Sequence, residues 1–156
     1  MDNRENQQHD DLRLRKCEIV RGHNSYLKIL KNSVLVSANL LKAFVSQERN
    51  PSDLASEIRT FRESPLFTNN VKVGFVVAKK KVGKAVLRNR IRRLLRESYR
   101  LNKNLFTAAD AKINIIFSLT ENGYKQFEIY PDIGFKIIDD EMKILASKII
   151  NQLKVK

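Results

Sequence analysis

The chain has 156 residues, a formal net charge of +13 and a sequence pI of about 10.0. Its length suits one domain with a modest core, and 42% hydrophobic with 30% charged residues indicates a globular rather than a disordered chain. The excess of cations predicts an anionic partner, while the single cysteine, Cys17, excludes an internal disulfide and favours a reducing compartment.

The N-terminal segment, residues 1–11, is polar and has no apolar residue after Met1. It is predicted to be a mobile tail, and its acidic character fits neither a secretory signal nor a transit peptide. No apolar run in the sequence approaches the length of a membrane span. We therefore expect a soluble, cytoplasmic protein whose single domain covers residues 12–156.

The first helix is predicted after residues 23–25, His-Asn-Ser, whose side chains can cap a helix. Its apolar positions are Tyr26, Leu27, Ile29 and Leu30. Two strands are predicted next, at residues 34–36 and 39–45, and the first is short enough for a sheet edge. Residues 47–70 contain two of the three prolines and one short amphipathic helical pattern, so we interpret them as an insertion on the surface in preference to a partner contact.

The stretch from Val71 to Lys103 carries twelve lysines and arginines against the single acid Glu97. Apolar residues alternate with other residues from Val71 to Val77, which predicts a half-buried strand, and a helical period begins at Ala85. At about 100° per residue, one arc of this helix is largely apolar. Its members are Leu87, Ile91, Leu94, Leu95, Ser98, Leu101 and Asn102.

The opposite face of the same helix carries Arg92, Arg93, Arg96 and Arg100, while Arg88 and Arg90 flank the apolar arc and Asn89 points away from it. Arginines recur at residues 88, 92, 96 and 100, and like charges at this spacing repel and destabilise an isolated helix. A solvated basic helix would gain nothing from this pattern. A polyanion bound to the basic face explains it better.

The remaining elements are a strand at residues 111–119, a loop at 121–135 and a closing amphipathic helix from about Asp139. The acids at 139–141 suit the N-terminus of that helix. The order is therefore α-β-β-β-α-β-α, which predicts an α+β fold with one four-stranded sheet and packed helices.

No catalytic residue is predicted on the protein. His9 and His23 stand apart from one another, and no cluster of histidine, cysteine and carboxylate has the spacing of metal ligands. Glycines are too few and too scattered for a phosphate-binding loop. The chain is thus expected to bind an anion without a metal or cofactor of its own.

Two runs within the basic stretch form a specific signature. They are Val73-Gly74-Phe75-Val76-Val77-Ala78-Lys79-Lys80 and Val82-Gly83-Lys84-Ala85-Val86-Leu87-Arg88-Asn89-Arg90-Ile91-Arg92-Arg93-Leu94. Together they resemble the signature of the protein component of bacterial ribonuclease P, roughly VGxxVxKKxGNAVxRNRIKR. Lys84 stands where that family usually has asparagine, which adds one cation beside the start of the helix.

The resemblance implies that a catalytic RNA with bound magnesium ions performs the hydrolysis, while the protein binds that RNA and the 5′ leader of precursor tRNA. Contacts with the catalytic RNA are then expected from Lys79, Lys80, Lys81, Lys84, Arg88, Asn89, Arg90, Arg92, Arg93 and Arg96. The fork of donors on arginine suits two phosphate oxygens at once. The resemblance also implies a left-handed crossover around the basic helix, where general chain geometry would favour a right-handed one.

The family's cleft for the unpaired leader falls on Tyr26, Leu30 and Phe44. Tyr26 and Phe44 offer rings for base stacking, and Leu30 does not. Without the resemblance, both aromatic residues are explained as ordinary core residues.

The alternative function is a non-catalytic nucleic-acid-binding protein of ribosomal or nucleoid type. The basic helix lacks Asn, Gln and Arg interleaved at base-reading positions, so a DNA partner is not expected. A membrane-surface helix is disfavoured because the sheet needs the apolar face of the helix.

Overall fold

A computed structural model describes residues 12–47, 71–106 and 112–154. The predicted tail at residues 1–11 and the predicted insertion beyond Gln47 lie outside these ranges. The elements are, in chain order, η1 (Lys16–Glu18), α1 (His23–Lys31), β1 (Val34–Ser37), β2 (Leu41–Gln47), β3 (Val71–Phe75), α2 (Ala85–Leu101), η3 (Lys103–Phe106), β4 (Ile113–Leu119), α3 (Glu121–Ile129) and α4 (Phe135–Lys154).

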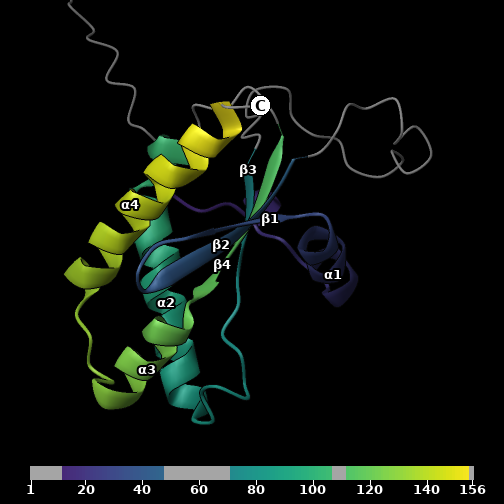
Figure 1. Cartoon of the computed structure of the whole chain (residues 1–156). Coiled ribbons are helices and arrows are strands. Elements are labelled where there is room, and N and C mark those ends of the chain that lie inside the picture. Colours follow the sequence, from purple (N-terminus) through teal and green to yellow (C-terminus); the bar gives the residue numbers. More distant parts are fainter. Residues whose placement is uncertain (1–11, 48–70, 107–111, 155–156) are drawn as a thin grey trace, which may run out of the picture.

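The four strands form one sheet in the order β1-β2-β4-β3 (Figure 1). β1 pairs with β2 and β2 with β4 in antiparallel fashion, whereas β3 runs parallel to β4. Parallel neighbours need a crossover connection, and α2 lies in the connection from β3 to β4. The predicted α+β fold with one four-stranded sheet is confirmed, and β1 lies at an edge as its short pattern indicated.

Helices cover both faces of the sheet, with α2 and α4 on one side and α1 on the other (Figure 1). Successive side chains of a strand point to opposite faces. On β4, Ile115 and Phe117 therefore join the core beneath α2 and α4, while Ile116 packs with Ile29 of α1. All seven residues of β4 are buried as a result.

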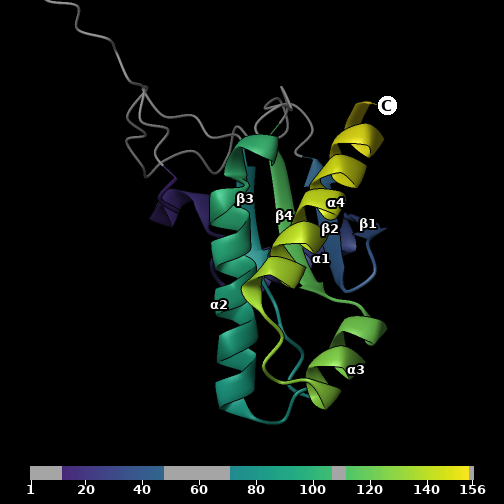
Figure 2. The ribbon, with the colours of Figure 1, turned by 90° about the vertical axis from the view of Figure 1, so that its left-hand side faces the viewer.

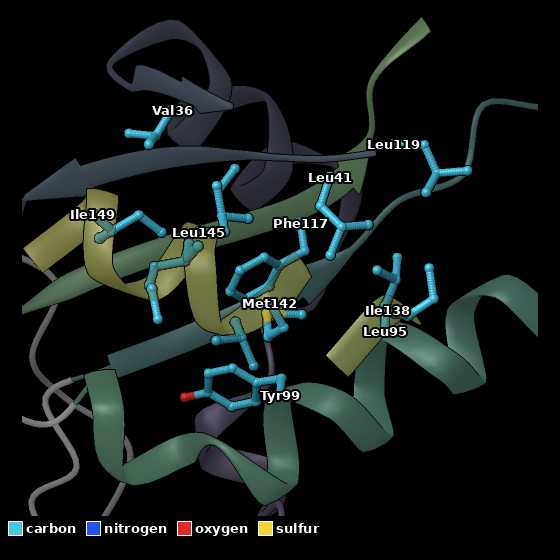
Figure 3. Packing of buried hydrophobic residues seen from close by; sticks show 14 of the residues in the cluster. Val36, Leu41, Leu95, Tyr99, Phe117, Leu119, Ile138, Met142, Leu145 and Ile149 are labelled. Atoms are coloured by element: carbon cyan, nitrogen blue, oxygen red, sulfur yellow. The ribbon is translucent and has the colours of Figure 1, made fainter. Parts of the chain in front are cut away.

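An aromatic cluster joins α2 to the sheet (Figure 3). The Tyr99 ring lies 5.6 Å from that of Phe117 and 5.2 Å from that of Phe106, centroid to centroid, and Phe75 completes the group. Burial, with the nearby Glu18 carboxylate, raises the pKa of Tyr99, so the phenol stays neutral. The cluster supplies the aromatic contacts that hold the basic helix on the domain.

The buried face of α2 differs in part from the predicted arc. Ile91, Leu95 and Ser98 are buried as predicted, but Tyr99 is also buried and Leu101 is 42% exposed. Tyr99 lies one turn after Leu95, where it reaches the aromatic residues of β3 and β4. The prediction missed this residue because no partner ring is visible in the local pattern.

The start of α1 also differs from the prediction. The helix begins at His23, and Gly22 is its N-cap with φ of 83° and no side-chain cap. The residues predicted to cap the helix, His23-Asn24-Ser25, lie in its first turn. Gly22 suits this position because a left-handed φ strains any residue with a Cβ atom.

The segment predicted as a loop after β4 contains the helix α3. Thr120 caps it by accepting a hydrogen bond at Oγ1 from the Gly123 amide, 3.0 Å away. A Cβ atom at Gly123 would lie 2.2 Å from the Leu40 carbonyl oxygen, so close packing explains this glycine. The predicted loop at 121–135 was therefore wrong in part, since Gly123 lies inside the first turn of a helix.

The closing helix starts at Phe135, one turn earlier than predicted. The acids at 139–141 therefore lie beyond its first turn, and two of them have specific partners. Asp139 accepts from Asn102 and from Ser98, and Glu141 accepts from the Leu40 amide at 2.7 Å. They connect α4 to α2 and to the β1–β2 turn. No helix in the described ranges is long and apolar enough to span a membrane.

A buried ion pair joins η1, before α1, to η3, which follows α2. Lys103 Nζ lies 2.6 Å from Glu18 Oε1, and the side chains are 7% and 3% exposed. Lys103 also donates to the Arg13 carbonyl, and Glu18 accepts from the Arg15 amide. The pair is therefore hydrogen-bonded on both sides, which a buried charge requires.

Lys103→Met is expected to lower the free energy of unfolding by about 3–5 kcal/mol, because it leaves the Glu18 carboxylate buried without its counter-charge. Urea denaturation followed by circular dichroism measures the change. Lys143→Met is the matched control, since the Lys143 side chain is 52% exposed and its pair with Asp139 lies near solvent. An equally small change in both variants would contradict a structural role for the buried pair.

Candidate nucleic-acid interface

α2 lies on the outside of the domain (Figure 2). Its outward arginines, Arg92, Arg93 and Arg96, are exposed. Arg93 and Arg96 are exposed and bond to no other described side chain or carbonyl. Arg92 donates to Asn89 Oδ1 at 3.1 Å, so the asparagine orients one arginine of the face. Guanidinium groups held outward in this way are available to pair with an anion.

Only Arg100 on this face has an acidic partner within α2. Its guanidinium donates to both Glu97 oxygens, at 2.9 Å and 2.6 Å. The hydrogen bond from Arg100 is the main cause that lowers the pKa of Glu97. The rest of the face keeps its repulsion between like charges, as the sequence indicated.

Arg88 and Arg90, which flank the buried face, both donate to backbone carbonyls of other segments. Arg88 Nη1 bonds to the carbonyls of Val82 and Gly83, at 2.8 Å and 2.6 Å. Arg90 bonds to the carbonyls of Pro131 and Ile133, at 2.6 Å and 2.9 Å. The sequence predicted RNA contacts for both residues, which stay a prediction, and the structure adds internal anchoring roles that no local pattern announced.

The loop before α2 brings four more cations to the start of the basic helix. Lys79, Lys80, Lys81 and Lys84 are exposed, while Val82 between them is buried and anchors the loop. Lys81 Nζ pairs with Glu121 Oε2 of α3 at 2.8 Å. This hydrogen bond raises the pKa of Lys81 and lowers that of Glu121.

The predicted RNA-contact residues thus lie in the loop before α2 and on α2 itself, with Arg88 and Arg90 at the flanks of its buried face. We call this the basic surface and define it by the predicted set, Lys79, Lys80, Lys81, Lys84, Arg88, Asn89, Arg90, Arg92, Arg93 and Arg96. Within the described ranges, no group of three or more His, Cys, Asp or Glu residues could hold a metal ion.

The residues predicted for a leader cleft lie on the opposite face of the sheet. Tyr26 and Phe44 are half-buried and pack on one cluster formed by Val20, Ile29 and Ile116. Leu30 of α1 is 38% exposed and stands outside this cluster. The structure therefore places the two aromatic residues on one cluster and leaves the leucine outside it.

Two neighbours of these aromatic residues were absent from the prediction. Gly74 lies beneath Tyr26, where a Cβ atom would come 2.7 Å from the tyrosine ring. Lys42 Nζ lies 5.7 Å from the centre of the Phe44 ring, in cation–π range. Lys42 sits two residues before Phe44 on the same strand face, a period-two signal that could have identified it.

Comparison with known proteins relates this arrangement to one family. The sequence model of the ribonuclease P family matches residues 14–131. A ribonuclease P protein component from Syntrophus aciditrophicus is 30% identical over 133 residues, covering 85% of this chain and 95% of that protein.

A second relative and a solved structure are also ribonuclease P proteins. The ribonuclease P protein component of Citrifermentans bemidjiense is 62% identical over 45 residues, 29% of this chain, and the match spans 36%, about a third, of that relative's length. The ribonuclease P protein of Staphylococcus aureus has a similar fold, with a TM-score of 0.56 at 19% identity, covering 87% of this chain and 96% of that one.

Arg90→Ala is expected to lower the free energy of unfolding by about 1–3 kcal/mol, because the part-buried Ile133 carbonyl and the exposed Pro131 carbonyl lose a charged donor. Arg93→Ala is the matched control on the same helix, and it should leave stability unchanged. Chemical denaturation of both variants measures the difference. Equal stability of the two would contradict the anchoring role of Arg90.

Proposed function

The chain belongs to the ribonuclease P protein family, and from this premise we propose that it assists a catalytic RNA in removing the 5′ leader of precursor tRNA. In this proposal the protein binds both the RNA and the leader. The family match over residues 14–131 includes the loop and the helix of the basic surface. The observation that carries the proposal is the outward face of α2, where Arg92, Arg93 and Arg96 are exposed and pair with no acid among the described residues.

The basic surface acts by neutralising RNA phosphates. Each cation that meets a phosphate releases condensed counterions, which favours binding most at low salt. Arg93 and Arg96 are suited to such contacts because each can present two donors to one phosphate. Asn89 contributes by orienting Arg92.

The cleavage chemistry is assigned to the RNA partner, with magnesium ions held by that RNA. The protein contributes binding energy and charge neutralisation, which help a folded polyanion to form at low magnesium. We accordingly place the protein in the cytoplasm with its RNA partner, and we assign it no DNA or membrane partner.

The leader is assigned to the opposite face of the sheet, at Tyr26 and Phe44. Both residues are only half-buried, which leaves part of each side chain accessible to an unpaired base. Lys42 stands over Phe44 and can meet the phosphate beside a stacked base. Leu30, which is exposed on α1, is assigned to the leader as the third residue of the predicted set.

Adding the purified protein to the ribonuclease P RNA encoded in the same genome is expected to stimulate precursor-tRNA cleavage at low magnesium. An Arg93→Ala, Arg96→Ala variant should bind that RNA more weakly. Its slope of log affinity against log salt should fall by roughly one to two units, because up to two phosphate contacts are lost. Filter binding across a salt series measures both quantities.

The control for this experiment is Lys136→Ala, Lys154→Ala, which removes the same formal charge from exposed positions on α4. It should bind nearly as tightly as the wild type. Precursor cleavage by the repurified protein without RNA would contradict the assignment of chemistry to the RNA. Wild-type affinity and slope in the arginine variant would remove α2 from the interface.

A Tyr26→Ala, Phe44→Ala variant is expected to bind the catalytic RNA normally and to lose about tenfold of its preference for precursor over mature tRNA. Stacking contributes roughly 1–3 kcal/mol per base, and only the precursor carries the leader. Binding of both tRNA forms to the reconstituted complex measures the preference, and thermal unfolding reports on the fold. Tyr130→Ala is the control, an exposed aromatic residue at the end of α3. A destabilised variant with unchanged preference would refute the leader assignment.

A further inference from the structure

The loop between β3 and α2 begins beyond the last backbone hydrogen bond to the sheet. The last backbone contact with β4 is the Val76 amide bonded to the Phe117 carbonyl at 2.9 Å. β4 ends at Leu119, so a residue two positions beyond Val76 has no strand partner. The Ala78 amide bonds instead to the hydroxyl of Tyr124, 3.1 Å away in α3.

Ala78 connects the Tyr124 hydroxyl to the turn that contains the lysines. Its carbonyl accepts hydrogen bonds from the amides of Lys81 and Val82, at 3.1 Å and 3.0 Å. Both backbone groups of Ala78 are therefore in use, one towards α3 and one towards the turn. A displacement of Ala78 would change the direction in which Lys79 and Lys80 leave the fold.

Tyr124 is built to hold this position. The residue is 8% exposed, and its hydroxyl also lies 3.3 Å from Ser118 Oγ, in a contact in which either atom can donate. Glu121 lies one turn earlier on the same face of α3 and pairs with Lys81. Two side chains on one face of α3 thus bind the loop. Tyr124 bonds to the Ala78 amide, and Glu121 pairs with Lys81.

The loop needs such support because of its charge. Four lysines lie within the six residues 79–84, and their mutual repulsion favours spread conformations. Ordering them only on binding would subtract from the affinity for RNA. A loop that is already ordered meets several phosphates without that loss.

We propose that α3 is a positioning element of the RNA interface, in which the Tyr124 hydroxyl and the Glu121 carboxylate hold the loop so that Lys79, Lys80 and Lys84 meet phosphates together. This inference rests on the proposed function, in which the loop contacts the catalytic RNA. Tyr124 itself acts through Ala78 and touches no RNA.

A double-mutant cycle between Tyr124→Phe and Lys79→Gln, Lys80→Gln tests the proposal. Tyr124→Phe removes only the hydroxyl and keeps the buried ring. In the wild-type background it should weaken binding to the ribonuclease P RNA roughly fivefold to tenfold and reduce the salt slope by about one unit. In the background without the two lysines, Tyr124→Phe should change the affinity by less than about twofold, because the cations that the hydroxyl positions are already absent.

Tyr130→Phe is the matched control, since it removes an exposed hydroxyl from the end of the same helix. It should leave both affinity and slope unchanged. Circular dichroism and thermal unfolding check that each variant is folded. Hydrogen exchange of the Ala78 amide in the wild-type protein gives a test that needs no variant, and the amide is expected to be protected.

A purely structural role for Tyr124 predicts the same loss in both backgrounds, with an unchanged salt slope, and this result would overturn the inference. Free exchange of the Ala78 amide in the wild type would overturn it as well. The proposed function fails separately, through loss of RNA binding by the wild-type chain or indifference to Arg93→Ala, Arg96→Ala. An additive cycle on a wild-type protein that binds RNA refutes only the role of α3.

Discussion

Burial of one face of α2 against the sheet is the interaction on which the rest of the structure depends. The helix carries repelling arginines along its outer side and would be poorly stable alone. Leu95 and Tyr99 hold it by packing among Phe117, Phe106 and the residues of α4. Apolar burial and ring contacts thus offset a charge distribution that favours the complex with a polyanion over the free protein. The helix can carry this concentration of cations because its other side is packed in the core.

The residues of the Arg-Asn-Arg signature have two structural roles, anchoring neighbouring segments and orienting another arginine. Arg88 and Arg90 point back to carbonyls on either side of α2, where they fix the loop before the helix and the turn after α3. Asn89, between them, faces outward and orients Arg92. A helical period of 3.6 residues produces this division, since neighbours in sequence differ by about 100° around the axis. The two arginines of a motif predicted to contact RNA therefore also form internal hydrogen bonds that hold the neighbouring segments in place.

The sequence predicted most of the strand and helix pattern and the exposure of Arg92, Arg93 and Arg96 on α2, because these depend on local periods of charge and hydrophobicity. It missed α3, since Gly123 resembles a helix breaker until the Leu40 carbonyl above it is known. It missed the burial of Tyr99 and the anchoring by Arg90 for the same reason. Their partners, Phe117 and the carbonyls of Pro131 and Ile133, are distant in sequence. Local patterns identify which residues are apolar or charged, and tertiary contacts decide what those residues bind.

β3 connects the two candidate binding surfaces through adjacent residues. Phe75 faces the core and stacks on Phe117, within the cluster that supports α2. Gly74 faces the other side and leaves room for the Tyr26 ring. Because neighbouring residues of a strand point to opposite faces, one strand can support the arginine helix and the aromatic site at once. Any side chain at Gly74 would push Tyr26 away from the sheet without touching the core beneath α2. The two surfaces therefore share one strand, and a substitution at Gly74 is confined to the face that carries the aromatic residues.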